Sequence, residues 1–438
     1  MARRHPERLE GRAIIPRHVS VFQSHGLRIA LLAAVLVCGV SLSVHAQWNP
    51  SESLVFGDGR LTLGGDVSAT FSCAGTGAED DGACGDDLGF FNYTDYEHSA
   101  VRMLRIDVSA DLRAGRHVSL LGEMRTENGS RPVPYALYLR IRPWPTRAFD
   151  IQAGRVPPTF GAFARRSYAT DNLLIGYPLA YQYLTSLRAD ALPADVEDLL
   201  RMRGRGWLST FPVGNRDAKA GLPLVSAFRW DTGAQVHAAR GRLDLAGGIT
   251  TGTLANPLVG DDNSGRQFSG RASFRVTPGL LLGASAARGP FVTRTAAEAA
   301  GAARADRLTQ TAWGADVEYS RDHYLVRVEA ITSRWRLPEI GPAAIRSPLR
   351  ATSASVEGRY KLQPGLYVAA RLDHLTFSTL TSGTLRTQWE APVTRVEVGG
   401  GYSLHRNLLL KLSVQHNTRP AGRVQQVTLG ATQLVFWF

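Results

Sequence analysis

The sequence predicts an all-β fold, a transmembrane antiparallel up-and-down β-barrel of about 16 strands. Three observations support this prediction. Apolar and polar residues alternate with a period of two over most of the chain after residue 60. The connections between the alternating segments are short and long in turn, as in membrane barrels. No apolar stretch reaches the roughly 18–20 residues of a transmembrane helix, whereas a barrel strand needs apolar residues only at alternate positions.

The alternation is clearest in residues 267–277. Phe268, Phe274 and Val276 lie on one face of this predicted strand, and Ser273 and Arg275 lie on the other. In a barrel this wide, the apolar face contacts lipid and the polar face contacts water inside. The predicted strands are 60–71, 101–112, 118–126, 135–142, 149–155, 231–239, 243–253, 267–277, 280–287, 309–319, 324–333, 352–362, 367–374, 393–402, 408–415 and 427–438.

The connections indicate which end of the barrel is which. Tight turns belong to the periplasmic side and long loops to the external side. The short connections are 113–117, 143–148, 240–242, 278–279, 320–323, 363–366 and 403–407. The long connections are 72–100, 127–134, 156–230, 254–266, 288–308, 334–351, 375–392 and 416–426. Aromatic side chains near strand ends are expected in the interfacial girdles, namely Tyr319, Tyr324, Tyr360, Tyr367, Tyr402 and Trp437.

The first 46 residues have the pattern of a secretory signal peptide. Arg28 precedes an uncharged run over residues 29–40, and Val44, His45 and Ala46 form a small-x-small cleavage site. We predict cleavage after Ala46, a periplasmic lead-in over residues 47–59, and a single barrel domain over residues 60–438.

Charge argues against nucleic acid as a partner. The chain has a formal net charge of +12. Residues 1–46 hold six arginines and two acids, so the remainder carries a net charge near +8. Its basic residues are dispersed and interleaved with acids, whereas nucleic-acid binding favours a basic cluster on one face.

Connection 156–230 is too long to lack structure of its own. It contains an apolar run over residues 173–187 and a predicted short helix over residues 194–202. We predict that it folds into the barrel and sets the pore size; the alternative is an external cap that packs on itself. Its predicted constriction residues are Asp190, Asp195, Glu197, Asp198, Arg201, Arg203 and Arg205.

Several arginines fall on the predicted inward face. We predict as pore-lining Arg105, Arg125, Arg140, Arg142, Arg271 and Arg275. The first four lie on three successive strands and are expected to form a basic patch that faces the loop acids across a gap. Opposed charges in a confined gap favour polar solutes. In the alternative interpretation these arginines pair with neighbouring strand acids and only solubilise the wall.

Two segments resemble the sixteen-stranded outer-membrane porins, general or phosphate-selective. The last alternating strand, residues 428–438, closes on a terminal Phe438, and the segment Gly154–Phe163 is similar to a strand end and loop start of several porins. The resemblance implies an outer-membrane location in a Gram-negative-type bacterium and recognition of Phe438 by the barrel-assembly machinery. It also implies pairing of the last strand with the first, contact with outer-membrane lipid and lipopolysaccharide, and a homotrimer.

The resulting expectation is a water-filled pore for passive diffusion of small polar solutes, with weak anion preference and no cofactor. A substrate-specific channel for phosphate or a carboxylate is the first alternative. A barrel enzyme or adhesin is the second. Asp373 and His374 are neighbours on opposite strand faces, Asp95 and His98 lie in a loop, and no nucleophile–base spacing stands out. The loop acids near Asp80 and Asp261 match no calcium-loop spacing, so no metal site is predicted.

Removal of the leader with Cys38 leaves Cys73 and Cys84, which we predict to form a disulfide. Closing this short loop is expected to contribute about 2–3 kcal/mol to stability. Peptide mass spectrometry of protein purified from membranes without reductant is expected to recover the cross-linked pair. Recovery of two alkylated free thiols would contradict the prediction.

Overall fold

The computed structural model describes residues 53–75, 104–144, 146–163, 166–226, 230–340, 345–382 and 384–438. The predicted signal peptide lies outside these residues, as do Cys38, Cys84, Asp95, His98 and the acids around Asp80. Cys73 is disulfide-bonded, and its partner also lies outside them, so the Cys73–Cys84 pairing stays a prediction.

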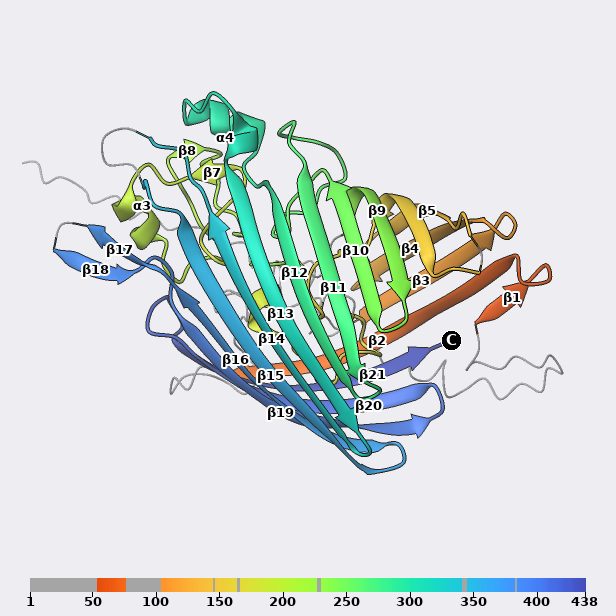
Figure 1. Cartoon of the computed structure of the whole chain (residues 1–438). Helices are drawn as coiled ribbons and strands as arrows, with labels where there is room; N and C mark the ends of the chain where they lie inside the picture. Colours follow the sequence, from red (N-terminus) through yellow and green to blue (C-terminus); the bar gives the residue numbers. More distant parts are fainter. Residues whose placement is uncertain are drawn as a thin grey trace, which may run out of the picture. The chain divides into compact units, whose positions relative to one another are not determined.

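Sixteen antiparallel strands form one closed barrel, each strand hydrogen-bonded to the next in the chain (Figure 1). The strands are β2 (Leu61–Gly75), β3 (Leu104–Arg113), β4 (Val118–Glu127), β5 (Val133–Ile141), β6 (Phe149–Val156), β9 (Asp231–Arg240), β10 (Leu243–Thr250), β11 (Gln267–Thr277), β12 (Leu280–Pro290), β13 (Thr309–Arg321), β14 (Tyr324–Trp335), β15 (Leu349–Gln363), β16 (Leu366–Phe377), β19 (Val393–His405), β20 (Leu408–Thr418) and β21 (Gln426–Trp437). Each corresponds to one predicted segment. Short and long connections alternate as predicted except between β4 and β6, where the connection 128–132 is shorter than the connection 142–148.

The barrel closes between its last and first strands. β21 pairs with β2 from Asp66 opposite Trp437 to Gly75 opposite Thr428. The backbone of Phe438 continues this pairing, because its N–H donates to the Gly65 carbonyl and its carbonyl accepts from the Gly65 N–H, both at 3.1 Å. The terminal pairing expected from the resemblance is therefore present.

The smaller elements are additional to the sixteen strands of the wall. In the predicted lead-in, β1 (Leu54–Phe56) pairs with the start of β2. Connection 157–230 carries α2 (Leu179–Gln182), β7 (Ala191–Leu192), α3 (Val196–Arg201) and β8 (Val213–Gly214). Other long connections carry α4 (Arg294–Ala299), the 3₁₀ turn η3 (Ala305–Arg307) and the hairpin of β17 (Thr379–Ser382) and β18 (Leu385–Gln388). No helix among the described residues is long and apolar enough to cross a membrane.

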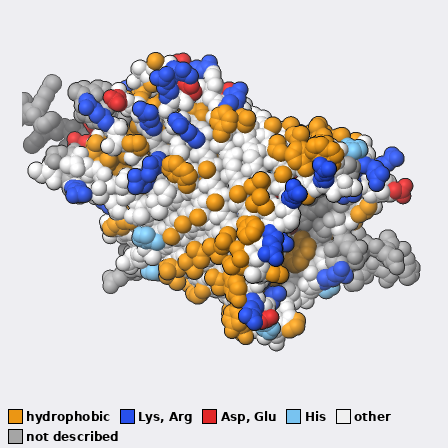
Figure 2. Space-filling model, in the orientation of Figure 1, with side chains coloured by type: hydrophobic (Ala, Val, Ile, Leu, Met, Phe, Trp, Pro, Cys, Tyr) orange, Lys and Arg blue, Asp and Glu red, His pale blue; other side chains and the backbone are white. Residues whose placement is uncertain are grey.

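The two faces of the wall differ as the alternation predicts. Phe268, Phe274 and Val356 are exposed on the outer face, although they are large and apolar. On the inner face, charged side chains such as Arg371 and Glu397 are fully buried. Figure 2 shows hydrophobic side chains across the outer surface of the strands. The apolar face of each strand therefore points outward, toward lipid.

Aromatic side chains mark the short-turn end of this apolar surface. Tyr319, Tyr324, Tyr360 and Tyr402 are exposed on the outer face, and the rings of Tyr324 and Tyr360 lie 4.8 Å apart. The prediction for Trp437 is wrong, because it lies opposite the inward Asp66 and packs against Ala169 and Val435. The prediction for Tyr367 is also wrong: its hydroxyl donates to the Leu173 carbonyl at 2.9 Å inside the barrel. Its position in the two-residue alternation, shared with Arg371, places it on the inner face.

Substitution of Phe274 with Arg is expected to destabilise the barrel. Register pairs place Phe274 level with Val328, which is four residues from Tyr324 on β14. This is about 13 Å along the strand and therefore close to the middle of the apolar band. An arginine there should lower the free energy of unfolding, measured by urea titration in lipid vesicles, by about 2–4 kcal/mol.

The matched control is Ser273→Arg. This neighbour points inward opposite Asp244, so it should cost less than about 1 kcal/mol. Equal costs for both variants, or a larger cost at Ser273, would reverse the assignment of the two faces.

Candidate pore constriction

Connection 157–230 folds into the barrel and contacts strands around most of its circumference (Figure 1). Its backbone or side chains bond to β11 and β12 through Thr159 and Gly161, to β4 through Tyr168 and to β16 through Leu173. Further bonds reach β14, β19 and β20. The apolar run predicted over residues 173–187 forms much of this inner segment, which is the candidate constriction.

The loop carries its own hydrophobic core, which explains why it folds as a unit. Leu179, Tyr183, Leu192 and Leu199 are buried in one cluster with side chains of the other long connections, including Trp389. The predicted helix is present as α3, and the carboxylate of Asp195 caps it by accepting from the Asp198 N–H at 2.9 Å. The loop thus consists of two parts: an inner segment that contacts the wall inside the barrel, and an outer cap at the long-loop end.

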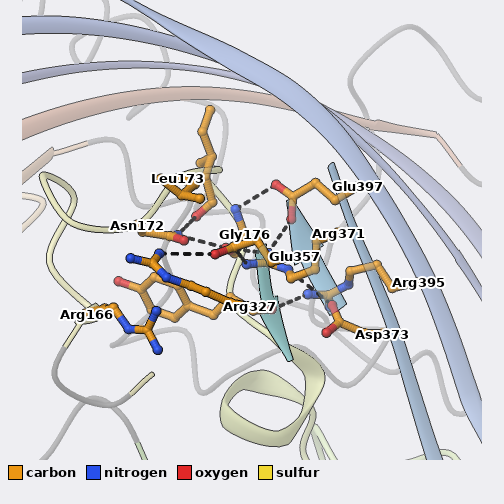
Figure 3. A network of polar contacts seen from close by, with 12 residues as sticks. Arg166, Asn172, Leu173, Gly176, Arg327, Glu357, Arg371, Asp373, Arg395 and Glu397 are labelled. Atoms are coloured by element: carbon orange, nitrogen blue, oxygen red, sulfur yellow. Dashed lines mark hydrogen bonds and ion pairs between the residues drawn. The ribbon is translucent and has the colours of Figure 1, made fainter. Parts of the chain in front are cut away.

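Arg371 is the centre of a fully buried ion-pair network between the loop and β15, β16 and β19 (Figure 3). Its guanidinium lies 2.5 Å from a Glu397 oxygen, 3.1 Å from a Glu357 oxygen and 3.3 Å from an Asp373 oxygen. It also donates to the Gly176 carbonyl of the loop at 2.6 Å. The single guanidinium of Arg371 therefore pairs with three carboxylates and also donates to the loop backbone.

The loop backbone itself completes the network. The Gly176 N–H donates to Glu397 at 2.9 Å, and Lys411 donates to the Ala169 and Asn172 carbonyls. A Cβ atom at position 176 would lie 2.6 Å from the Glu397 carboxylate, so only glycine permits this approach. Wall charges that would otherwise face water are therefore used to hold the loop.

A second group of buried charges lies on β3 to β5, where the basic patch was predicted. Arg105 bonds to Glu127 at 2.8 Å and to the Tyr177 hydroxyl of the loop at 3.0 Å. Arg125 bonds to Asp107 at 2.5 Å and lies 3.7 Å from the centre of the Tyr135 ring. The two arginines do lie on neighbouring strands, but each is buried against a carboxylate.

The remaining predicted wall arginines differ in environment. Arg140 pairs with Asp150 at 2.8 Å, and Arg271 pairs with Asp316 at 2.5 Å. Arg142 follows the end of β5 and is exposed at the short-turn end, as is Arg275 near the end of β11. For four of the six arginines, the structure thus shows the alternative interpretation, in which wall arginines pair with strand acids.

The predicted loop charges lie in the outer cap and do not face the basic patch. Asp190 bonds to Arg188 and Lys219 of the same loop. Burial favours a higher pKa for Asp190, but these hydrogen bonds outweigh it and hold that pKa below its usual range. Asp198 pairs with Arg201 at 3.1 Å. Glu197 and Arg205 are exposed, and Arg203 is half-buried. The charged side chains of the loop therefore pair within the cap, instead of facing the wall arginines across the pore as predicted.

A group of partly exposed cations was not singled out from the sequence. Arg166 of the loop and Arg327 of β14 both bond to Glu318, at 3.2 and 2.9 Å. Arg359 of β15 is half-buried, lies 6.0 Å from the Tyr367 ring centre and has no acidic partner among the described residues. We call Arg166, Arg327 and Arg359 the cation triad. Arg327 also pairs with Glu357 at 3.3 Å. Arg359 is therefore the member of the triad whose charge no carboxylate among the described residues matches, and it keeps partial contact with water.

Glu390 is a further residue that the sequence did not indicate. It is fully buried and accepts from the backbone N–H groups of Ser186 and Ala391, both at 2.8 Å, and of Gly204 at 2.5 Å. Burial raises the pKa of this carboxyl group. It joins the connection before β19 to the loop, more than 180 residues away in the chain. No local pattern could reveal such a contact.

Replacement of Arg371 with Met should release the loop, because three buried carboxylates would lose their shared cation. We expect a loss of about 3–5 kcal/mol in unfolding free energy, measured by urea titration, together with faster proteolysis between residues 166 and 188. Arg321→Met, on an exposed turn residue, should change neither. Unchanged protease resistance in the Arg371 variant would show that the loop is held in another way.

Comparison with known proteins gives matches in structure but not in sequence. No family model matches the chain, and no curated protein matches it. The anion-selective porin of Comamonas acidovorans superposes with a TM-score of 0.53 at 10% identity, covering 86% of this chain and 99% of that one. A loop-deletion variant of OmpT from Vibrio cholerae gives 0.52 at 12%, with the same coverage. Salmonella typhi OmpF gives 0.51 at 11%, covering 86% and 98%. Together with the closed sixteen-stranded sheet, these likenesses show that the chain has the outer-membrane porin fold.

Proposed function

We propose that this protein is a porin through which small polar solutes diffuse passively, with a weak preference for anions. The observation that supports it best is a long loop that narrows a closed barrel while water-exposed charge remains beside it. The porin-like channel follows from the fold. The preference for anions rests on the cation triad and not on the net charge of the chain.

A passing ion responds mainly to charges that no neighbouring opposite charge neutralises. Arg105, Arg125 and Arg371 are buried in contact with carboxylates, so their fields largely cancel at a distance. The cation triad keeps partial contact with water, and the Arg359 guanidinium has no carboxylate bonded to it in the described part of the chain. A mobile anion in a narrow aqueous path is attracted by such uncompensated charge.

A channel specific for phosphate or a carboxylate is the second candidate. Guanidinium groups bind both anions through paired N–H donors, and the triad offers several such donors. Saturable conductance in phosphate, with block of chloride current at low phosphate, would favour this candidate.

We further propose a homotrimer, the form named for one OmpT structure that superposes on this chain with a TM-score of 0.50. Enzymatic activity is not proposed, because the inward charges are used in ion pairs and in holding the loop.

Arg359→Gln should shift the reversal potential toward cations in a planar bilayer with a KCl gradient. A unit charge acting across about 10 Å of water contributes about 0.4 kcal/mol, attracting an anion and repelling a cation by that amount. The anion-to-cation permeability ratio should therefore fall about fourfold at low salt. The shift should vanish near 1 M salt, where the screening length is about 3 Å.

Two controls accompany this measurement. Arg321→Gln removes the same charge from an exposed turn and should leave the ratio unchanged. The paired variant Arg140→Ala/Asp150→Ala removes one charge of each sign and should also have little effect. A cation-selective wild-type pore, or equal shifts in Arg359→Gln and Arg321→Gln, would contradict the proposed origin of anion preference.

A further inference from the structure

Basic side chains surround the short-turn mouth of the barrel. Each of the seven short turns has at least one exposed cation within three residues of it. In chain order these cations are Arg113, Arg116, Arg142, Arg147, Arg240, Arg242, Arg275, Arg321, Lys361 and Arg406, and the lead-in adds Arg60. Among the described residues of the same region, the exposed acids are Asp58 and Asp322. This end of the barrel is therefore strongly positive.

Part of this charge points into the pore. Arg113, Arg275 and Lys361 are exposed at inward positions near the ends of β3, β11 and β15. Arg142 continues the inward alternation past the end of β5. Arg60 lies beside Arg113, whose N–H donates to the Arg60 carbonyl at 2.7 Å. We call these five residues the short-turn collar. They come from strands spaced around the barrel, so their charges face the water of one mouth.

The inward charges at the opposite ends of the strands have a different environment. Arg113 of the collar pairs with Asp111 at 3.3 Å, whereas the other four collar residues form no ion pair within the described part of the chain. Near the long-loop ends, the charged side chains at inward positions are all buried, namely Arg105, Arg125, Glu127, Asp231 and Arg395. Exposed inward charge on the wall is therefore concentrated at the short-turn end.

The short-turn collar adjoins the residue to which anion preference is attributed. Lys361 is two residues from Arg359 on the same face of β15. Beyond Arg359, the loop covers wall charges that are paired and buried, such as Arg371 with Glu397. The water path thus has two zones in series. The zone from the short-turn mouth to Arg359 is mainly positive, and the zone beside the loop is nearly neutral.

We propose that the short-turn collar concentrates small anions at the periplasmic mouth and makes the conductance of the pore depend on the direction of the voltage. The inference rests on the proposed porin function, and it takes the short-turn end as the periplasmic one. Fixed positive charge attracts anions and excludes cations over about one screening length, about 10 Å at 0.1 M salt. The collar therefore passes anions more readily than cations, whereas the zone beside the loop does not discriminate as strongly.

Two such zones in series make the current asymmetric. When the external side is positive, anions enter the lumen through the collar, and cations that arrive from outside are held back by it. Both ions then accumulate between the two zones, and the conductance rises. When the voltage is reversed, anions leave through the collar while it excludes cations from the periplasmic side. The lumen then loses salt, and the conductance falls.

The test records single channels of the intact protein in a planar bilayer with equal KCl on both sides. Orientation is determined after each recording by the side from which a polymer-linked maleimide, too large for the pore, reaches Gln363→Cys at an exposed turn position. In about 0.1 M KCl, the current with the external side positive should exceed the reversed current about twofold. Near 1 M KCl, where the screening length is about 3 Å, the two currents should be equal.

Two triple variants change the collar without breaking an ion pair. In Arg142→Gln/Arg275→Gln/Lys361→Gln, the current ratio should fall to about one while the pore still conducts. In the corresponding Glu variant, the larger current should occur at the opposite voltage. The urea midpoint of unfolding should match that of the parent in both variants, because these side chains are exposed.

The matched control is Arg307→Gln/Arg336→Gln/Arg346→Gln, which removes the same charge from exposed residues of the long connections. It should keep the direction and size of the asymmetry. An asymmetry that survives in the Gln collar variant, or that disappears equally in the control, would overturn the proposal. A conducting wild-type pore with symmetric current would overturn the collar alone, whereas a protein that conducts no ions would overturn the porin function and this inference together.

Discussion

A backbone N–H or C=O group without a partner costs several kcal/mol in hydrocarbon, and a sheet has such groups along both edges. The pairing of β2 with β21 removes these edges, and with them the largest obstacle to placing this chain in a membrane. The exchange of hydrogen bonds between Gly65 and Phe438 carries the pairing to the last residue. Once the sheet is closed, the alternation along each strand fixes which side chains face lipid and which face the interior.

Closure also creates a difficulty, because it turns many charged side chains inward. A wide barrel leaves them facing water, but the loop between β6 and β9 takes the place of part of that water, and unpaired buried charges are costly. The loop between β6 and β9 solves much of this by supplying backbone groups as partners. Gly176 offers both a carbonyl to Arg371 and an N–H to Glu397, and Lys411 is held by two further carbonyls. The same contacts that satisfy the wall also hold the loop inside the barrel, so the stability of the wall and the position of the loop depend on one set of bonds.

The architecture was predictable because its signals are local and repeated. A period of two identifies a strand and its lipid face from a few residues, as with Phe268 and Phe274, and loop lengths then order the strands. Tyr367 shows the limit of the aromatic rule: an aromatic residue near a strand end is assigned correctly only when its phase in the alternation is followed.

The candidate site was less predictable, because its partners are distant in the chain. The sequence contains Arg105 and Tyr177, or Glu390 and Gly204, without any sign that the loop brings them together. The inner part of the loop was expected to act through its side-chain charges, whereas much of its contact with the wall is made by backbone groups. Backbone contacts leave little trace in composition; Gly176, where a side chain would clash with Glu397, records one of them.

Formal charge is therefore a poor guide to what this protein attracts, and the accessibility of each charge is a better one. Inside the barrel, acids and bases are both abundant, and many are matched within bonding distance, whereas Arg359 has no acidic partner among the described residues. Outside it, the strands present no acid to lipid, but Arg288, Arg334 and Arg350 are exposed at outward positions. The same residue type thus has three proposed roles on two faces of one wall: Arg371 holds the loop, Arg359 attracts mobile anions, and Arg334 faces lipid. Neighbouring acids, or their absence, distinguish these roles.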